Sequence, residues 1–260
     1  MRAHLGGTEM AMAVTDVDEE YTWAHSFDRA LRVPVDGIIA FDNSASVEAF
    51  AREHDRLAPN VPFVSMGAYW SEAQSFVGID LRAGADAAMD HLISTGRKRI
   101  AYLAPMASDL VNEGPRFDAY RQRMEGEGLE SRTITTPDAT PSSVRETLKR
   151  IYDSSEAPEA ILCMNDDLAI AAAFALEGLG RKVGQDVALV GFDGIDETQH
   201  YPCPISTVRQ PIDEMCALTW QFLKDQMEDP TGPLQQRVLK PELIIRESSS
   251  GVSPRSAILS

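Results

Sequence analysis

The sequence predicts an α/β fold with parallel sheets, divided into two lobes. The clearest signal is Glu159–Asp193, where apolar runs at Ala160–Met164 and Val187–Val190 flank the Ala- and Leu-rich segment Leu168–Leu179. Strands of a parallel sheet are buried on both faces and look continuously apolar, and helices join them. The same alternation recurs along the chain and gives more strands than one core holds comfortably, which favours two lobes with a cleft between them.

Residues 1–79 are predicted to alternate strands with two helices. An apolar run that ends in Thr15 and Asp16 predicts the first strand, and aromatic side chains at helical spacing predict an amphipathic helix after it. Pro34 precedes the next strand, and Ser44 or Ser46 can cap the second helix. The predicted strands are Met10–Val14, Val35–Phe41, Val61–Met66 and Phe76–Ile79, and the predicted helices are Glu19–Leu31 and Val47–Leu57.

The pattern continues through the rest of the chain, where glycines mark several helix ends. Val238–Ile245 is mostly apolar and predicted to be extended, with Pro241 placing it near a sheet edge. Ser248–Ser260 is rich in Ser, Gly and Pro and is predicted to be a loose tail. The remaining predicted elements are the helices Gly84–Thr95, Pro115–Glu127, Ser142–Ser154 and Ile212–Met227 and the strands Arg99–Ala104 and Ile205–Val208.

Charge and composition narrow the functional class. A net charge of −16 repels a phosphate backbone, so the chain is expected to bind nucleic acid poorly by itself. No apolar run approaches the roughly 20 residues that span a membrane, and no basic segment followed by an apolar one opens the chain. Cys163, Cys203 and Cys216 are widely spaced and are expected to be reduced thiols, which suit the cytoplasm.

Polar residues follow the predicted strands at their carboxyl ends. Asn165 and Asp167 come after one strand, and Asp193 ends the next. In parallel sheets, ligands bind beyond this rim, where helix N-termini also point. Helix capping and turn formation are the alternative roles, because Asn and Asp favour both. Asp166 is expected to cap the helix.

Several stretches match one protein family in order and spacing across nearly the whole chain. One stretch alone carries little weight, but the ordered set is specific. They are VDGIIAF (Val35–Phe41), VGIDLRAGADAAMDHLISTGRKRIAYLAP (Val77–Pro105), RFDAY (Arg116–Tyr120), AILCMNDDLAIAA (Ala160–Ala172), DVALVGFDG (Asp186–Gly194), ISTVRQP (Ile205–Pro211) and LKPELIIRES (Leu239–Ser248). The set resembles the effector-binding core of the LacI/GalR family of bacterial transcription regulators.

The resemblance implies a periplasmic-binding-protein-like fold of type I. One lobe would comprise residues 1–79 and 210–237, and the other residues 80–209 and 238–247, with a flexible tail at 248–260. The resemblance also implies a small-molecule effector, most simply a carbohydrate, and a homodimer. It implies no catalytic residue, no metal and no cofactor.

Two departures from the family pattern concern the N-terminus. The helix-turn-helix and hinge helix of the family have no counterpart here, and the first strand and helix of the core are also unmatched. We therefore expect an incomplete N-terminal lobe, and operator DNA contacts only through a domain missing from this chain. Trp23, Phe27 and Phe50 are candidates for the dimer interface or the core. A smaller departure is Arg97, which follows Gly96 where the family usually has His.

Arg116 is the most informative candidate for effector binding. It falls in the first turn of a predicted helix, where a cation opposes the helix dipole at a cost of about 0.3–1 kcal/mol. Its guanidinium fork suits paired hydroxyls or a carboxylate. The resemblance assigns Arg116 to the family's effector-contacting arginine, and Asn165 and Asp193 to a cleft-facing pair. The alternative for Arg116 is an exposed side chain paired with a nearby acid.

The other candidate site residues rest on the resemblance more loosely. Asp167 occupies a position where some members carry another polar contact, and Ile212 matches a position that packs on the effector. Phe192 either stacks on a ring or belongs to the core. Asp80 lies at the first crossing between the lobes, as a hinge residue or a contact.

These observations predict the carbohydrate-sensing domain of a LacI/GalR-type regulator, which is not an enzyme. One alternative is a stand-alone carbohydrate-binding protein. The other is a magnesium-dependent α/β enzyme that uses Asp80, Asp167 and Asp193.

Overall fold

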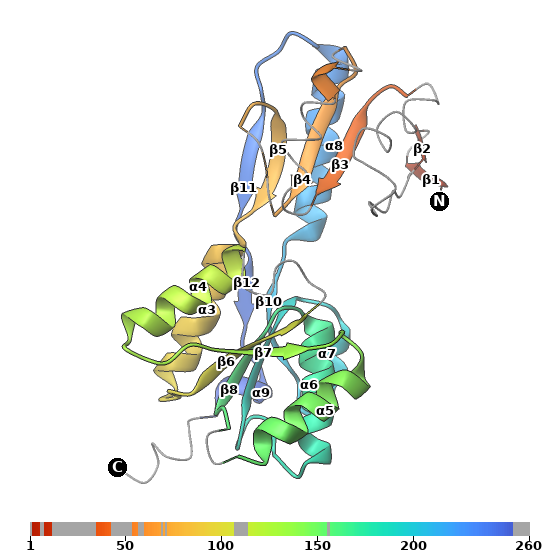
Figure 1. Ribbon diagram of the computed structural model, residues 1–260. Coiled ribbons are helices and arrows are strands. Elements are labelled where there is room, and N and C mark those ends of the chain that lie inside the picture. Colours follow the sequence, from red (N-terminus) through yellow and green to blue (C-terminus); the bar gives the residue numbers. More distant parts are fainter. Residues whose placement is uncertain are drawn as a thin grey trace. The chain divides into compact units, whose positions relative to one another are not determined.

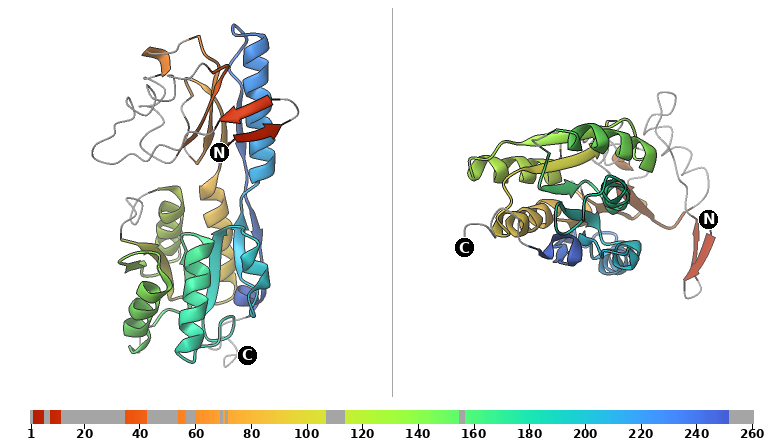
Figure 2. Two further views of the ribbon diagram at one scale, coloured as in Figure 1. Left: turned by 90° about the vertical axis from the view of Figure 1, so that its right-hand side faces the viewer. Right: turned by 90° about the horizontal axis from the view of Figure 1, so that it is seen from below.

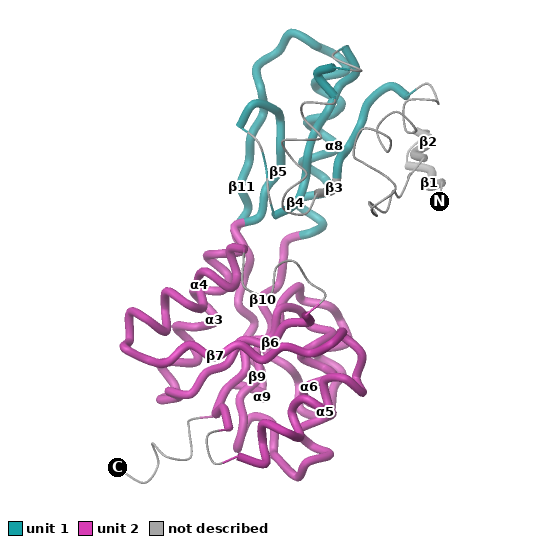
Figure 3. Tube along the Cα trace, viewed as in Figure 1, with its two compact units in different colours: residues 1–79, 212–239 teal, residues 80–211, 240–260 magenta. Residues whose placement is uncertain are grey.

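The computed structural model of the protein describes residues 2–5, 8–11, 35–42, 54–56, 60–68, 70, 72–106, 114–154 and 157–251. The chain divides into two compact units (Figure 3), one of residues 1–79 and 212–239 and the other of residues 80–211 and 240–260. The second segment of the first unit, residues 212–239, begins and ends two residues later than the predicted range of 210–237. Each unit is built around a parallel sheet with helices, which confirms the predicted fold class.

The first unit contains a four-stranded parallel sheet in the order β11-β5-β4-β3. Helix α8 (Ile212–Glu228) packs on it and buries Met215 and Leu223. Both β4 and β5 are buried along their whole length, as their apolar sequences predict. The strands are β3 (Ile38–Asp42), β4 (Phe63–Gly67), β5 (Ser75–Ile79) and β11 (Gln236–Leu239).

The N-terminal residues form a separate antiparallel pair of β1 (Arg2–Leu5) and β2 (Thr8–Ala11). The predicted strand Met10–Val14 therefore begins in β2, and its last three residues lie outside the described residues. The predicted helix Glu19–Leu31 also lies outside them, as do Trp23, Phe27 and Phe50. Of the predicted helix Val47–Leu57 the structure describes residues 54–56, which are helical.

The second unit contains a six-stranded sheet in the order β12-β10-β9-β8-β6-β7. All neighbouring strands are parallel except β12, which pairs antiparallel with β10 at one edge. The central strands are buried up to their last residues, with Ile161, Leu162 and Val190 at 1% exposure or less. The strands are β6 (Ile100–Pro105), β7 (Arg132–Thr136), β8 (Ala160–Cys163), β9 (Ala188–Asp193), β10 (Ser206–Arg209) and β12 (Glu242–Ile244).

Helices cover both faces of this second sheet (Figures 1 and 2). Helices α3 (Leu81–Ser94) and α4 (Pro115–Gly126) pack together on one face, and α5 (Pro141–Tyr152) and α6 (Asp166–Gly178) on the other. The alanines of α6 lie at the centre of the core, because their small side chains let the helix approach β8 and β9 closely. The short helix α7 (Glu197–His200) follows β9. Within the described residues, we find no helix that combines the length and apolar character needed to cross a membrane.

The order of the strands places a switch point between β6 and β8. The chain leaves β6 for β7 at one edge, then returns to β8 on the other side of β6 and continues to β9 and β10. The connections after β6 and β8 therefore turn to opposite faces of the sheet. In α/β sheets, ligands bind beyond the carboxyl ends of the strands at such a switch point.

Two sequence predictions about strands need correction. Strand β7 was not predicted, because RTITT is rich in threonine and lacks the apolar run of a central strand; it lies at the sheet edge, where β-branched Thr fits well. The single extended segment predicted for Val238–Ile245 is two strands in different units, β11 and β12. The break falls at Pro241, which has no N–H to give to a ladder.

The prediction of a loose tail from Ser248 is wrong for the residues that the structure describes. Ser248 is fully buried in the short helix α9 (Glu247–Ser250), where its hydroxyl accepts from the N–H of Ser206 (2.8 Å) and donates to the carbonyl of Leu189 (2.7 Å). Arg97, only 1% exposed, donates to the carbonyl of Gly251 (2.6 Å). Polar side chains therefore fix this segment to the second unit, and residues 252–260 lie outside the description.

Candidate functional site

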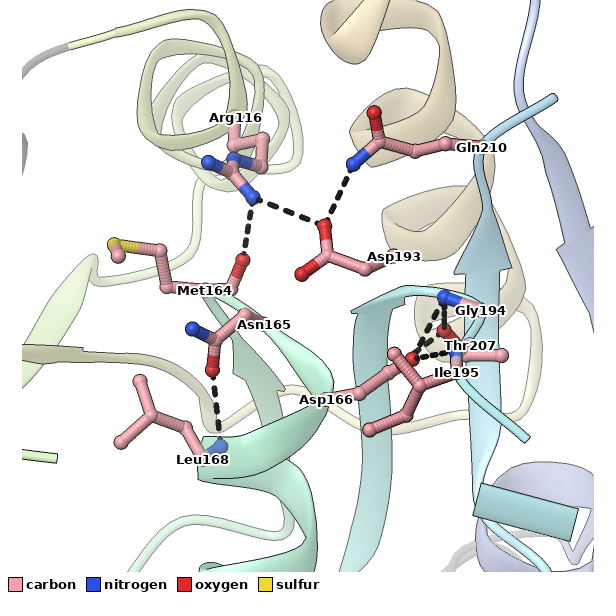
Figure 4. Close-up of polar contacts among 10 residues, drawn as sticks. All are labelled: Arg116, Met164, Asn165, Asp166, Leu168, Asp193, Gly194, Ile195, Thr207 and Gln210. Carbon is pink, nitrogen blue, oxygen red and sulfur yellow. Dashed lines mark hydrogen bonds and ion pairs between the residues drawn. The ribbon is translucent and has the colours of Figure 1, made fainter. Parts of the chain in front are cut away.

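Arg116 links the two sides of the switch point (Figure 4). Gly114 and Pro115 begin α4 with no side-chain cap, and Pro is well suited to a first helical position. The Arg116 side chain crosses to the residue after β8, where its Nη1 donates to the carbonyl of Met164 (2.7 Å). Its side chain is 18% exposed, so the guanidinium held by this carbonyl lies in a largely buried position.

Asp193 faces Arg116 from the end of β9. Its Oδ1 lies 3.8 Å from Arg116 Nη1 and accepts a hydrogen bond from Nε2 of Gln210 (2.6 Å), the residue after β10. The Asp193 side chain is 36% exposed. The ends of three neighbouring strands, β8, β9 and β10, therefore contribute to one polar cluster.

The backbone at Asp193 is strained. Among the described residues, Asp193 is the only non-glycine residue with a positive φ, at 112°. Such a conformation costs about 1–3 kcal/mol and persists where the surrounding structure imposes it, often at binding sites. Burial raises the pKa of Asp193, whereas the charge of Arg116 and the hydrogen bond from Gln210 lower it. The nearby cation therefore favours the carboxylate form that accepts hydrogen bonds.

Phe192 is buried next to Arg116 and is not an exposed part of this cluster. Its side chain is 1% exposed, and its ring centroid lies 5.1 Å from Cζ of Arg116. The ring holds the guanidinium through a cation–π contact and belongs to the core, which is one of the two roles expected from the sequence.

Asn165, not Asp166, caps helix α6. Oδ1 of Asn165 accepts from the N–H of Leu168 (3.0 Å) and so caps α6, while in the described part of the chain its Nδ2 has no hydrogen-bond partner. Asp166 was expected to be the cap, and that prediction is wrong. It is 1% exposed, and its carboxylate accepts from Gly194, Ile195 and Thr207, residues far along the chain. Burial, chiefly, raises the pKa of Asp166 to about 6.

The remaining candidates are placed less centrally. Oδ1 of Asp80 accepts from the N–H of Ala83 (2.9 Å) and caps α3. Asp167 is exposed in the first turn of α6, and its charge raises the pKa of Asp193. Ile212 begins α8 in the other unit and is 43% exposed. Among the described residues, no three His, Cys, Asp or Glu side chains gather where they could hold a metal ion.

Gln210 is the site residue that sequence reasoning missed. It follows the predicted strand Ile205–Val208 and falls inside the matched stretch Ile205–Pro211, so it occupies a strand-end position like those of Asn165 and Asp193. Its signal in the sequence is therefore the same as that of Asn165 and Asp193, a polar side chain just after a predicted strand.

The cluster offers donors and acceptors at short range. Arg116 supplies several N–H donors in one plane, Asp193 supplies acceptor oxygens, and the amides of Asn165 and Gln210 can both donate and accept. These groups match a neutral polyol, whose hydroxyls also both donate and accept.

Comparisons with known proteins agree with this architecture. The family model for a periplasmic binding protein-like domain matches residues 89–249. The HTH-type transcriptional regulator DegA of Bacillus subtilis is 32% identical over 96% of this chain and 74% of its own length. The chain spans only 52% of the length of another curated regulator and 53% of a curated repressor. These relatives are named as regulators and repressors, which confirms the prediction that the chain is not an enzyme.

Two solved structures extend the comparison. A regulatory protein of the LacI family from Chloroflexus aggregans is 28% identical with a TM-score of 0.74, over 90% of this chain and 84% of that one. A complex of the transcriptional regulator CelR with cellobiose is also 28% identical, with a TM-score of 0.67 over 82% of this chain and 66% of that one.

Proposed function

This chain belongs to the LacI/GalR family of bacterial transcription regulators as an effector-binding core, and we propose that it senses a carbohydrate bound at the polar cluster of Arg116, Asn165, Asp193 and Gln210. The observation that carries the proposal is the bridge made by Arg116, which donates to the carbonyl after β8 and faces the carboxylate at the end of β9. This bridge spans the switch point, where α/β sheets bind ligands.

The geometry of the bridge suits a pair of hydroxyls. The 3.8 Å between Arg116 Nη1 and Asp193 Oδ1 is longer than a direct hydrogen bond, so each group keeps capacity for a further partner. A sugar hydroxyl can accept from the guanidinium and donate to the carboxylate, and an adjacent hydroxyl can pair with Asn165. Asp167 is a further contact in this proposal. Phe192 acts indirectly, through its ring contact with Arg116. Asp80 caps α3 and has no part in it.

The comparisons support a carbohydrate over other small molecules. The CelR structure, at 28% identity, is described as a complex with cellobiose. The relationship makes a sugar the natural first choice here, although the particular sugar can differ between family members.

We propose further that the chain acts as a homodimer in the cytoplasm and that it reaches operator DNA through a separate domain. The net charge of −16 disfavours contact of this core with a phosphate backbone. Sedimentation at micromolar concentration should show a dimer, and a mobility-shift assay of these 260 residues with a palindromic duplex should show no specific complex. A monomer, or a specific complex, would contradict the respective statement.

A thermal-shift screen tests the effector class. Cellobiose, lactose, ribose and a set of nucleosides would each be added in a concentration series, because a ligand that binds only the folded state stabilises it by RT ln(1 + [L]/Kd), about 2.7 kcal/mol at 100 times Kd. At least one sugar should raise Tm in a dose-dependent manner, and mannitol at equal concentration serves as a control for non-specific polyol effects. Stabilisation by nucleosides alone would overturn the carbohydrate assignment.

A further inference from the structure

Asp166 joins three elements around the candidate site (Figure 4). Its Oδ2 accepts from the backbone N–H groups of Gly194 (2.7 Å) and Ile195 (2.9 Å), and its Oδ1 accepts from the hydroxyl of Thr207 (2.7 Å). Asp166 is the first residue of α6, Gly194 and Ile195 form the turn after β9, and Thr207 lies in β10. One buried carboxylate therefore ties the helix to the two neighbouring strand ends.

The turn that Asp166 holds is the turn that orients Asp193. The two N–H groups bound by Asp166 follow directly after Asp193, which has the strained φ of 112°. Gly191 leaves room for this arrangement, since a Cβ there would lie 2.1 Å from Oδ1 of Asp166. These bonds restrain the backbone directly after Asp193, in addition to the pairing of β9 with β10, and their loss would let the strained turn relax toward ordinary conformations.

We propose that Asp166 is the positioning residue of this site: it holds Asp193 toward Arg116 and Gln210 without contacting the effector, and its protonation weakens effector binding. The inference rests on the proposed function of the cluster. A carboxylate accepts at both oxygens, whereas protonation turns one oxygen into an O–H donor that faces a donor already there, so the carboxyl no longer accepts from the two N–H groups and the Thr207 hydroxyl together.

The electrostatic surroundings place this protonation in an accessible pH range. Burial raises the pKa of Asp166 to about 6, and the charge of Asp193 adds to this effect, while the three hydrogen bonds oppose it. The other groups that face this region are Arg116 and Asp167, which act on Asp193, and the buried thiol of Cys163 on β8. Effector affinity is therefore expected to fall as the pH decreases through about 6.

The stability of the fold should respond in the opposite direction. The folded pKa of Asp166 lies above the ordinary value of about 3.9, so the folded state binds this proton more tightly than the unfolded state. The contribution of Asp166 to the free energy of unfolding therefore increases as the pH falls through about 6 and is lost as the pH rises. If Asp166 only stabilised the fold, a pH change that weakened effector binding would also lower the free energy of unfolding.

An NMR titration of the backbone amides and of the Arg116 Nε–H, between about pH 8 and about pH 5, tests the proposal without any sugar. The signals of Gly194, Ile195 and Arg116 should titrate with a common midpoint near 6. Asp166→Asn should remove this step. Thr207→Val, which keeps the Asp166 carboxyl, should move the midpoint to higher pH, because it removes a hydrogen bond that lowers the pKa of Asp166.

Asp186→Asn is the matched control. Asp186 also accepts from a backbone N–H, that of Lys182 (2.8 Å), but it is exposed and precedes β9 at the opposite end from Asp193. The step should persist in this variant. If Asp166→Asn keeps the step, or if Gly194 and Ile195 titrate while Arg116 does not, Asp166 does not position the site.

A second experiment measures the affinity of the wild type and of Asp166→Asn for cellobiose, lactose and ribose at about pH 7.5 and about pH 5.5. If only the ionised form is competent, affinity of the wild type should fall about fourfold, and Asp166→Asn should show little of this change. An equal fall in both proteins would overturn the inference. If none of the sugars binds, the proposed function fails, and the NMR titration alone decides the role of Asp166.

Discussion

At Asp193 the chain adopts a backbone conformation that few residues other than glycine tolerate. The φ of 112° is maintained at the point where the carboxylate faces Arg116 and Gln210, and the next residue, Gly194, also has a positive φ of 83°. A glycine at position 193 would fit this backbone with less strain. The presence of Asp at a strained position indicates that its side chain is used there.

Asp193→Gly and Asp193→Ala separate strain from side-chain function. Both remove the carboxylate, but only glycine relieves the conformation at φ 112°. Asp193→Gly should therefore be more stable than Asp193→Ala by about 1 kcal/mol, after allowing for the greater freedom of glycine in the unfolded chain. Urea denaturation of the two variants measures this difference.

Both variants should bind the effector more weakly than the wild type. Equal stability of the two would show that the backbone at residue 193 relaxes once the side chain is removed. Undiminished binding by either one would remove Asp193 from the site.

Single residues were predictable from the sequence where their position alone defined their role. Asn165 and Asp193 end apolar runs, and the structure places Asp193 next to Arg116, as the strand-end argument implies. The contacts of Asp166 could not be derived in the same way. They depend on the register of β9 and β10, which brings Gly194 and Thr207 within reach of a helix start.

At the scale of elements, helix starts perform two functions in the second unit. Asn165 and Asp80 each satisfy a backbone N–H of the helix they begin, and both lie among the residues expected to bind an effector. A cap holds a polar side chain in a fixed place at a strand end, so structural and binding roles are compatible in one residue.

Substitution of Asn165 distinguishes its two roles. Asn165→Ala should lower the free energy of unfolding by about 1 kcal/mol, because the N–H of Leu168 loses its acceptor. Asn165→Ser keeps an acceptor and should retain most of the stability, but it has no amide Nδ2 to donate to a sugar. Denaturation together with calorimetry should find the serine variant stable yet weaker in binding; full binding by that variant would leave Asn165 as a cap alone.

The segment around α9 is part of the second unit, and the fully buried side chain of Ser248 forms hydrogen bonds to two strands, β9 and β10. Ser248→Ala leaves the N–H of Ser206 and the carbonyl of Leu189 without their partner and should cost about 1–3 kcal/mol. Ser250→Ala, two residues away and exposed, is the matched control and should change stability little. Equal melting temperatures for the two variants would restore the description of this segment as a loose tail.

Central elements were predictable from the sequence, and edge elements were not. Strands β8 and β9 are apolar along their length because both faces are covered, so composition alone identifies them. Among the described strands, β7 lies at the edge with a neighbour on one side, and its sequence is rich in threonine. The division of β11 and β12 between two units depends on long-range pairing with β5 and β10, which no local pattern carries.

At the scale of the whole molecule, the ordered family stretches carried more information than any composition argument. They predicted an α/β fold and membership in the LacI/GalR family, which the comparisons confirm. The identity of the effector is not encoded in the same way. One fold hosts many functions, so specificity depends on a few side chains at the site rather than on the fold.

The carbohydrate site is tested most directly by calorimetric titration of the stabilising sugar into wild type, Arg116→Ala and Arg121→Ala. Loss of the guanidinium should weaken binding by about 1.5–3 kcal/mol, roughly 10- to 150-fold, with little change in melting temperature. Arg121 lies on the same helix, is 56% exposed and faces Asp118, so its variant should bind like the wild type. Binding by Arg116→Ala within about threefold of the wild type, with an unchanged melting temperature, would contradict the assignment of this cluster as the effector site.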